Sequence, residues 1–534
     1  NTVKLIEGMT ERYISASFGP LRQAGEALVG REVTPRVTFR EANASLFGTF
    51  RGISAALHLP INAILKGANK EGFAKALTDA DYGTAYKAFL TDTPILDQTT
   101  RIELDTLKAI RASGDDLGSR AYNALGHIIR LPGRLLMTGD ELFKTVAYHQ
   151  ELGALSYRQA SREAAEKVQS GAMKAGEVPS FITERVRGLL DSVPEEMGHS
   201  AMDAARYATF QEEITNGFVK GVQNLRNAHP VMKFVVPFLR TPWNIMKQSI
   251  GERTPLALLR KDFWEQVARG GPEGDAALAR LMIGTTFLSQ AIMWSMDGNI
   301  SGSRRQKSAV RNTERFDKIP PYSIKIGDRY YQYNRLEPFG LLMGMGADIG
   351  TAVNNWSPDQ GESDILEAMT VAATVATANV TDKTWFKGIA DIVMAIQDPN
   401  RYLKTYADNL GTTVITPYSS LLRRINIDHD PIAREAWTFM DKWKAKIPGM
   451  SDELPPRRDY LGRPREKTQH LGAAWISPIA AGVEEEDPLY QELARLSFNY
   501  SMPDKDLYSI GIDVTPEQYS RFLEIRGQED LGGG

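Results

Sequence analysis

The sequence predicts a mainly α-helical protein: an elongated multi-helix assembly with one isolated β-hairpin near residues 322–333 and an extended C-terminal arm. Three observations lead to this fold class. Apolar residues recur at the three- and four-residue spacing of helices through most of the chain. One short segment instead alternates with a period of two around a Gly-Asp pair. Beyond Pro448, prolines, tyrosines and charges replace the helical pattern.

The composition is that of a folded protein and excludes several kinds of site. The chain has 534 residues, 42% of them apolar and 24% charged. Its net charge of -3 gives no general attraction to nucleic acid, so any such contact has to be local. The absence of cysteine excludes disulfides, thiolate zinc sites and cysteine nucleophiles. Because the chain begins at Asn1 and ends at GQEDLGGG, we expect a piece of a larger polypeptide.

Changes of pattern divide the chain into five expected segments. The first two are helical, and the second of them ends in a proline-rich connector. The third combines an uncharged helix, a basic loop and the hairpin, the fourth is helical, and the fifth is the C-terminal arm. Their expected bounds are 1–115, 116–270, 271–355, 356–446 and 447–534.

Two helices with capping-box spacing are expected before the connector. Thr138 with Glu141, and Ser192 with Glu195, have the spacing at which a hydroxyl and a carboxylate satisfy the first amides of a helix. The second helix is expected to continue through an apolar stripe, interpreted as core packing, at Phe210, Ile214, Phe218, Val222 and Leu225. The bent connector that follows is broken by Pro230, Pro237, Pro242 and Pro255.

The longest uncharged stretch runs from Leu281 to Met296. A helix of this length spans about 24 Å, less than the ~30 Å hydrocarbon core of a bilayer. The stretch also contains threonine, serine and glutamine, so a buried helix is preferred over a membrane span. Further along, GMGADIG at Gly344–Gly350 lacks the spacing of a dinucleotide-binding loop and indicates close helix packing.

The hairpin signal lies in residues 320–338, PPYSIKIGDRYYQYNRLEP. Alternating residues flank a two-residue loop at Gly327-Asp328, which is the pattern of a tight hairpin. A lone two-stranded hairpin is marginal in water, so it needs something to pack on. We therefore expect an assembly element that fixes the uncharged helix beside it, formed by Tyr322, Ile324, Ile326, Tyr331 and Tyr333.

The densest run of positive charge lies between the uncharged helix and the hairpin. Two interpretations stay open: a solvated loop, or a surface that meets the phosphates of DNA or of lipid headgroups. The residues concerned are Arg304, Arg305, Lys307, Arg311, Arg315 and Lys318.

Signatures of chemistry are missing elsewhere. The seven histidines are scattered without metal-ligand spacing, and no zinc-protease, nucleophile-elbow or phosphate-loop motif occurs. DGNISG, from Asp297 to Gly302, matches the start of a calcium loop, but Ser308 at the last ligand position lacks a carboxylate, so an ordinary turn is expected. We expect no catalytic, cofactor-binding or metal-binding residue, no cofactor and no enzymatic activity.

Several stretches taken together resemble one family of phage proteins, the large internal virion proteins of tailed phages. These are also called ejection proteins or large polyvalent proteins. The resemblance runs from Leu131 to the end, through TGDELFKTVAYHQEL, AARYATFQEEI, PFLRTPWNIMKQSIGERTP, MDGNISGS and PPYSIKIGDRYYQYNRLEPFGLLMGMGADI. It continues in PPRRDYLGRPRE, WISPIAAGVEEEDPLYQELARL and DVTPEQYSRFLEIRG.

The resemblance implies a structural protein, packed inside the capsid of the virion and delivered into the host cell envelope to assist genome ejection and DNA translocation. The partners to expect are further copies of the chain in a homo-oligomer, the portal or other ejection proteins, phage DNA, and the host membrane after ejection. Two alternatives stay open. The chain is a non-catalytic C-terminal segment of a giant virion-packaged enzyme, an RNA polymerase or murein transglycosylase, or it is a co-injected effector that blocks host defence.

Overall fold

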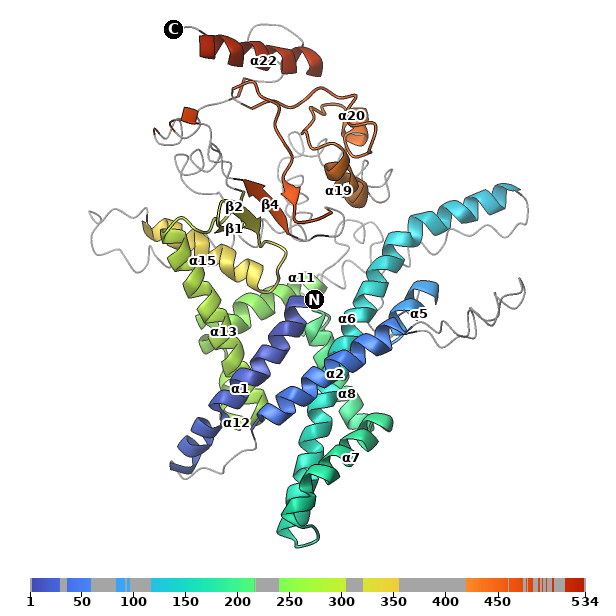
Figure 1. The fold of residues 1–534 in the computed structure, drawn as a ribbon, viewed down its shortest axis with the longest axis vertical. Helices are drawn as coiled ribbons and strands as arrows, with labels where there is room; N and C mark the ends of the chain where they lie inside the picture. The colour runs from blue at the N-terminus through green and yellow to red at the C-terminus, as the bar shows by residue number, and fades with distance from the viewer. Residues whose placement is uncertain are drawn as a thin grey trace. The chain divides into compact units, whose positions relative to one another are not determined.

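The computed structural model confirms that the protein is mainly α-helical, with a small antiparallel sheet (Figure 1). The chain divides into two compact units, Asn1–Thr286 and Phe287–Gly534. The finer division into five segments stays a prediction. The structure describes residues 2–28, 36–58, 83–91, 94–96, 117–215, 217, 240–303, 320–354, 419–459 and 461–473, with shorter stretches between 477 and 532.

The first unit is organised around one long helix, α6 (Leu117–Gln169). Helix α2 (Phe39–Leu57) lies alongside it (Figure 1). Further helices of this unit are α1 (Thr2–Leu28), α5 (Thr84–Thr91), α7 (Val178–Asp191) and α8 (Glu195–Ala208). Apolar side chains from α6, α7 and α8 form small core clusters, one of which contains Leu152, Leu189, Met197 and Ala201.

Small residues allow α2 and α6 to approach closely. A Cβ atom added at Gly48 of α2 would lie 2.1 Å from the carbonyl oxygen of His149. One added at Gly153 of α6 would lie 2.3 Å from the carbonyl oxygen of Ala44. Both distances are too short for any side chain, so glycine is required where the two backbones meet.

The predicted capping boxes are both wrong. Thr138 lies inside α6, where its hydroxyl donates to the carbonyl oxygen of Arg134 at 2.7 Å. Glu141 is buried and accepts a hydrogen bond from the amide of Leu96 at 3.0 Å. The other helix, α8, begins at Glu195 after Pro194, and no side chain caps it. The i, i+3 spacing of hydroxyl and carboxylate also occurs inside helices. Packing with the rest of the chain decides whether such a pair starts a helix or lies within one.

The predicted apolar stripe after α8 does not continue as one helix. The helix ends at Ala208, and Phe210 has a φ of 58°, a left-handed conformation that a helix does not accept. Asn244 donates to the carbonyl oxygens of Phe210 and Glu212, so a neighbouring element holds the break. Phe218, Val222 and Leu225 lie outside the described residues.

The connector is described from Arg240 onward, and its Pro230 and Pro237 lie outside the described residues. Helix α11 (Arg240–Met246) buries Pro242 and continues as a π-helical turn, η4 (Lys247–Gly251). Pro255 opens a 3₁₀ turn, η5 (Pro255–Leu259), where a missing N–H costs nothing. Helices α12 (Lys261–Arg269) and α13 (Gly271–Met296) follow. The expected uncharged helix is therefore the carboxyl part of α13.

In the second unit the predicted hairpin forms, but it is not isolated. Strands β1 (Ser323–Ile326) and β2 (Arg329–Gln332) pair around Gly327, whose φ is 66°. Strand β2 also pairs with β4 (Ala480–Val483), which pairs with β3 (Gln469–His470), so the strand order is β1-β2-β4-β3. The sequence AAGV of β4 carries no alternating pattern, which is why the extra strand was not expected.

The other edge of the hairpin holds the segment that follows α13. The amide of Ser301 donates to the carbonyl oxygen of Ser323, and the amide of Lys325 donates to that of Asn299, both at 2.8 Å. The motif DGNISG ends the helix in the expected turn, with Gly298 at a φ of 73°. The hairpin thus anchors the carboxyl end of α13.

Helix α15 (Phe339–Asn354) packs closely on the same part of α13. Cβ atoms added at Gly346 and Gly350 would lie 2.6 Å and 2.4 Å from the carbonyl oxygens of Leu288 and Ile292. The Ser295 hydroxyl donates to a carbonyl oxygen of α15 at 2.6 Å. The interpretation of GMGADIG as a helix-packing motif is confirmed.

The rest of the second unit combines short helices with extended segments. The helices are α19 (Ser419–His429), α20 (Phe439–Lys444) and α22 (Pro516–Gly532). Buried Asp430 joins these segments, because it accepts hydrogen bonds from Arg434 at 3.0 Å and Ser451 at 2.7 Å.

Candidate functional site

The residues predicted to contact phosphate lie outside the described residues, so that prediction stays open. They are Arg304, Arg305, Lys307, Arg311, Arg315 and Lys318.

The predicted assembly residues of the hairpin divide into buried and accessible ones. Tyr322 and Tyr333 are buried with their rings edge to face, 6.2 Å apart, and the Tyr333 hydroxyl donates to the carbonyl oxygen of Ser301 at 2.7 Å. Ile324 and Tyr331 face each other across the strands and are half-buried. Ile326 is 62% exposed. The two buried tyrosines therefore pack the sheet onto its own chain, and the assembly role of the other three stays a prediction.

The first unit buries a set of charged side chains that sequence reasoning missed. We call it the buried charge network, and it brings together α1, α8, α13 and the turn after η4. Three cations and three carboxylates take part, so the formal charges balance. Its members are Lys4, Glu7, Glu11, Tyr207, Glu252, Arg253 and Arg280.

Arg253 is the centre of the network and has no exposed surface. Its guanidinium donates to the Glu7 carboxylate and, at 3.4 Å, to that of Glu11. It also donates to the carbonyl oxygen of Gln248 at 2.6 Å and to the Tyr207 hydroxyl at 3.1 Å. Five donors in a fixed planar arrangement make arginine the residue suited to this position.

Tyr207 connects the network to its other charges. Its hydroxyl donates to Glu252 at 2.7 Å. The Lys4 ammonium lies 4.1 Å from the centre of its ring, and the Arg280 guanidinium lies 4.5 Å from it. Arg280 in turn donates to Glu11 at 3.1 Å. One aromatic ring therefore holds two cations that would otherwise repel each other.

Close backbone packing places α13 against Arg253. A Cβ atom at Gly284 would lie 2.1 Å from the carbonyl oxygen of Arg253, so only glycine fits there. On the other side, the residues of α1 that join the network share one helix face, because they are three, four and seven positions apart.

Ion pairing holds the network in its charged form. Burial alone would raise the pKa of Glu7, but Lys4 and Arg253 outweigh it and lower that pKa to about 2. Burial also works to raise the pKa of Glu252, and nearby guanidinium groups lower it overall. Burial, together with the charge of Arg253, lowers the pKa of Lys4 to about 8.

This arrangement suits structure better than turnover. A general acid or base works best with a pKa near the working pH, and here only Lys4 approaches that condition. Its side chain is buried, bonded to Glu7 at 2.9 Å and stacked on Tyr207. These contacts occupy the Lys4 ammonium.

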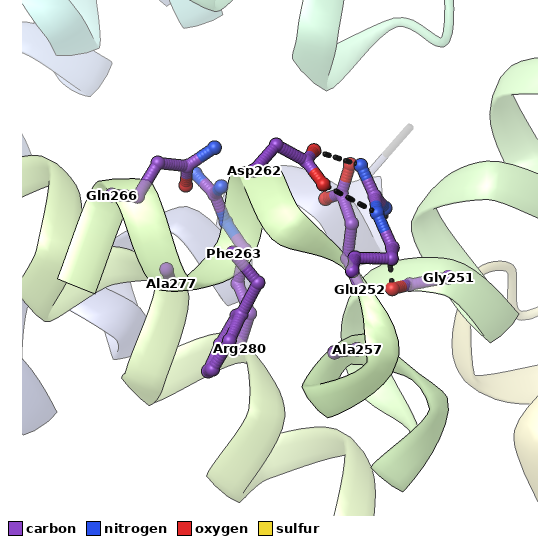
Figure 2. A pocket seen from close by; sticks show the side chains of 9 residues that line it. Gly251, Glu252, Ala257, Asp262, Phe263, Gln266, Ala277 and Arg280 are labelled. Carbon is purple, nitrogen blue, oxygen red and sulfur yellow. Dashed lines mark hydrogen bonds and ion pairs between the residues drawn. The ribbon is translucent and has the colours of Figure 1, made fainter. Parts of the chain in front are cut away.

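The cavity drawn in Figure 2 lies beside the network and is small, about 40 Å³. One wall carries Arg260, whose guanidinium is bonded to Asp262 and to the carbonyl oxygen of Gly251 at 3.2 Å. Another wall carries Arg280 of the network. A water molecule needs about 10–15 Å³ by this measure, so the cavity holds a few waters and no substrate of ordinary size. Within the described ranges, no group of three or more histidine or acidic side chains is arranged to hold a metal ion.

Helix α13 exposes large apolar side chains and buries small ones. Gly284, Ala291 and Ser295 face its neighbours. The exposed side carries Met282, Phe287, Met293, Trp294 and Met296, which are 37–58% accessible. The preferred interpretation as a buried helix is therefore only partly right, since 28% of its most apolar window is buried.

By length and composition alone, α13 is the one helix among the described residues that is able to cross a membrane. Its 26 residues span about 39 Å, more than the stretch predicted from charge alone. The apolar helix α15, by contrast, is buried from Phe339 to Asp348.

Comparison of the chain with models of protein families, with curated proteins and with solved structures finds no match.

Proposed function

We propose that this chain is a structural segment of an internal virion protein, or ejection protein, of a tailed phage. It is packaged inside the capsid and delivered into the host cell envelope, where it assists genome ejection and DNA translocation. It acts there as a homo-oligomer with the portal or other ejection proteins, and it performs no catalysis.

The observation that carries the proposal is the exposed apolar side of α13. A soluble protein seldom leaves this many large methionine and aromatic side chains of one helix in water, and such surfaces mark contacts with proteins or membranes. A protein that changes from capsid to envelope needs a surface of this kind, covered by other virion proteins first and by lipid later. The length of α13 and the resemblance of the chain to ejection proteins support the same assignment.

The chemistry of the described residues points in the same direction. The charged groups that are brought together in the first unit are paired with each other, and the cavity beside them holds only water-sized molecules. The ion pairs of this unit hold its helices against one another. DNA contact is left to the basic run that begins at Arg304.

Dye release from lipid vesicles tests the role of α13. The purified chain is expected to release the dye, and Met282→Asp with Met293→Asp is expected to abolish release, because a buried carboxylate is costly in hydrocarbon. The control is Leu259→Asp, which places the same charge at an apolar position that is 83% exposed on η5. Release that survives the α13 changes would contradict this role.

Mass spectrometry of intact particles tests the virion assignment separately. The chain is expected in purified particles and, after infection, in the membrane fraction of the host. A chain found only in the cytoplasm of infected cells, and absent from particles, would exclude it.

A further inference from the structure

Helices α1 and α2 both leave large apolar side chains exposed. We call this surface the α1–α2 face and define it by Ile6, Leu21, Phe39, Phe47, Phe50 and Leu57, which are 44–74% exposed. Eight helix positions separate Phe39 from Phe47 and seven separate Phe50 from Leu57, so the α2 members lie on one side of the helix.

The inward side of α2 explains why its phenylalanines stay outside. The buried residues of this helix are small or polar, including Gly48, Gly52 and Ala56. A Cβ at Gly48 or Gly52 would collide with the backbone of α6, so the contact has no room for a large side chain. The normal polarity of a surface helix is inverted, and 74% of Phe47 remains exposed.

The exposed sides of the two helices form one continuous surface. The Tyr13 hydroxyl of α1 donates to the side chain of Asn43 at 2.7 Å, and the Tyr13 ring lies 6.5 Å from that of Phe39. Asn43 and Phe39 are both exposed on α2. The exposed surface of the two helices is therefore joined through Tyr13, Phe39 and Asn43.

The charges of these helices are divided between the two sides. Each carboxylate of α1 and α2 is in an ion pair: Glu7 with Arg253, Glu11 with Arg280, Glu26 with Arg36 and Glu41 with Arg158. The exposed charged residues of α2 are Arg40 and Arg51, and both are basic. Arg51 lies 3.8 Å from the Asp191 carboxylate of α7, so it is partly neutralised. The α1–α2 face is thus apolar, bordered by arginine and without an exposed carboxylate on its two helices.

We propose that the α1–α2 face docks on the surface of an anionic lipid bilayer, with both helices in the plane of the membrane. The phenylalanines enter the boundary between headgroups and acyl chains, and Arg40 and Arg51 lie among the lipid phosphates. A second copy of the chain fits less well. A two-fold interface through this face would bring like arginines together, and the Asp191 carboxylate is already paired with Arg51 of its own copy.

This inference rests on the proposed delivery to an envelope, but it concerns a surface separate from α13. The two helices lie on the membrane, whereas α13 is the helix long and apolar enough to enter it. The two ideas are therefore tested by variants of different helices.

Flotation with lipid vesicles tests the inference. The probes are vesicles of phosphatidylcholine mixed with phosphatidylglycerol, and vesicles of phosphatidylcholine alone. The double variant Phe47→Ser and Phe50→Ser is expected to weaken binding to the mixed vesicles by about tenfold or more, because two exposed rings no longer enter the bilayer. The control is Leu259→Ser, an apolar position on η5 that is 83% exposed, and this variant is expected to bind as the unmodified chain does.

The charge of the border is tested by Arg40→Gln. One basic residue near an anionic surface contributes about a fivefold change in binding, so binding to the mixed vesicles is expected to fall by that factor. Binding to phosphatidylcholine alone is expected to stay unchanged.

A single probe gives a direct readout of docking. The chain contains no cysteine, so Phe47→Cys can be labelled at one position with an environment-sensitive dye. Its emission is expected to shift to the blue with mixed vesicles, whereas the same dye at Leu259→Cys is expected to stay in water.

Three results would overturn the inference. They are failure of the unmodified chain to bind the mixed vesicles, unchanged binding by the double phenylalanine variant, and loss of self-association in sedimentation by that variant without loss of vesicle binding. The last result would assign the face to a second copy. If the α13 changes abolish dye release but the phenylalanine variant floats as the unmodified chain does, this inference is overturned. The proposed function then stands.

Discussion

Replacing Arg253 by methionine tests the idea that paired charges hold the first unit together. Methionine keeps most of the volume of the side chain but removes all of its donors. The carboxylates of Glu7 and Glu11 then lose a buried partner, and the Tyr207 hydroxyl and the Gln248 carbonyl lose a donor. Lys4 and Arg280 remain, so the network becomes short of one positive charge.

The expected cost follows from the burial of these groups. Removing one member of a buried ion pair leaves an uncompensated charge, which costs about 3–5 kcal/mol. Arg253 and Glu7 have no exposed side-chain surface, so solvent does not reduce this effect. Removing both charges, with Glu7→Gln added to Arg253→Met, avoids the unpaired carboxylate. The double variant is expected to recover about 1–3 kcal/mol relative to the sum of the two single changes.

Urea unfolding of the four proteins in this cycle gives the free energies, and hydrogen exchange of the amides in α1 shows where the loss occurs. The control is Arg269→Met, which breaks an exposed pair with Glu273, 3.3 Å away. Such a surface pair contributes less than about 1 kcal/mol, so the control is expected to unfold almost as the unmodified protein does.

The reasoning is refuted if Arg253→Met costs no more than the control, or if the two single changes add without coupling. Either result would mean that the stability of the first unit does not depend on the buried charge network. Unchanged exchange of the α1 amides would show that Arg253 does not hold that helix.

Three further predictions concern other parts of the fold. Gly48→Ala is expected to lower the melting temperature by several degrees, because its Cβ would lie 2.1 Å from a carbonyl oxygen of α6; Gly188→Ala, with nothing within 4 Å, is expected to raise it slightly. In urea titrations at different pH values, the advantage of the unmodified chain over Glu7→Gln is expected to shrink as the pH falls from about 4.5 toward 2. The fold lowers the pKa of Glu7 from 4.5 to about 2, so the stabilising ionised form is lost over that range; an advantage independent of pH would contradict this. Tyr333→Phe leaves the carbonyl oxygen of Ser301 without its donor and is expected to cost about 1–3 kcal/mol by chemical unfolding, whereas an equally stable variant would show that water replaces the hydroxyl.

Sequence patterns predicted the elements that depend on interactions between residues close together in the chain. The hairpin turn at Gly327 and the end of α13 at Gly298 each depend on a glycine with positive φ, and both were identified from the sequence. The packing of Gly346 and Gly350 on a neighbouring helix follows from the same kind of reasoning. Strand β4 was missed because AAGV forms a strand only through pairing with β2 and β3, which no local pattern predicts.

The buried charge network was not identified for a physical reason. Lys4, Glu7 and Glu11 form a stripe on α1, and a stripe of charges is usually a solvated face. Their partners lie more than 200 positions away in Arg253 and Arg280, and no spacing in the sequence relates them. The α1–α2 face was missed for a similar reason. Periodicity in the sequence distinguishes the two sides of a helix but does not show which side is buried.

The inversion of α1, with its acids inside and Ile6 and Leu21 outside, has a consequence for how the unit responds to its surroundings. Charged contacts that solvent does not reach keep their strength whether the medium around the protein is aqueous or oily, and a lower dielectric strengthens them further. A core held only by apolar contacts loses its driving force in an apolar medium. The buried ion pairs of Lys4, Glu7 and Arg253 do not depend on contact with water, so we expect them to persist when the medium outside the unit becomes less polar.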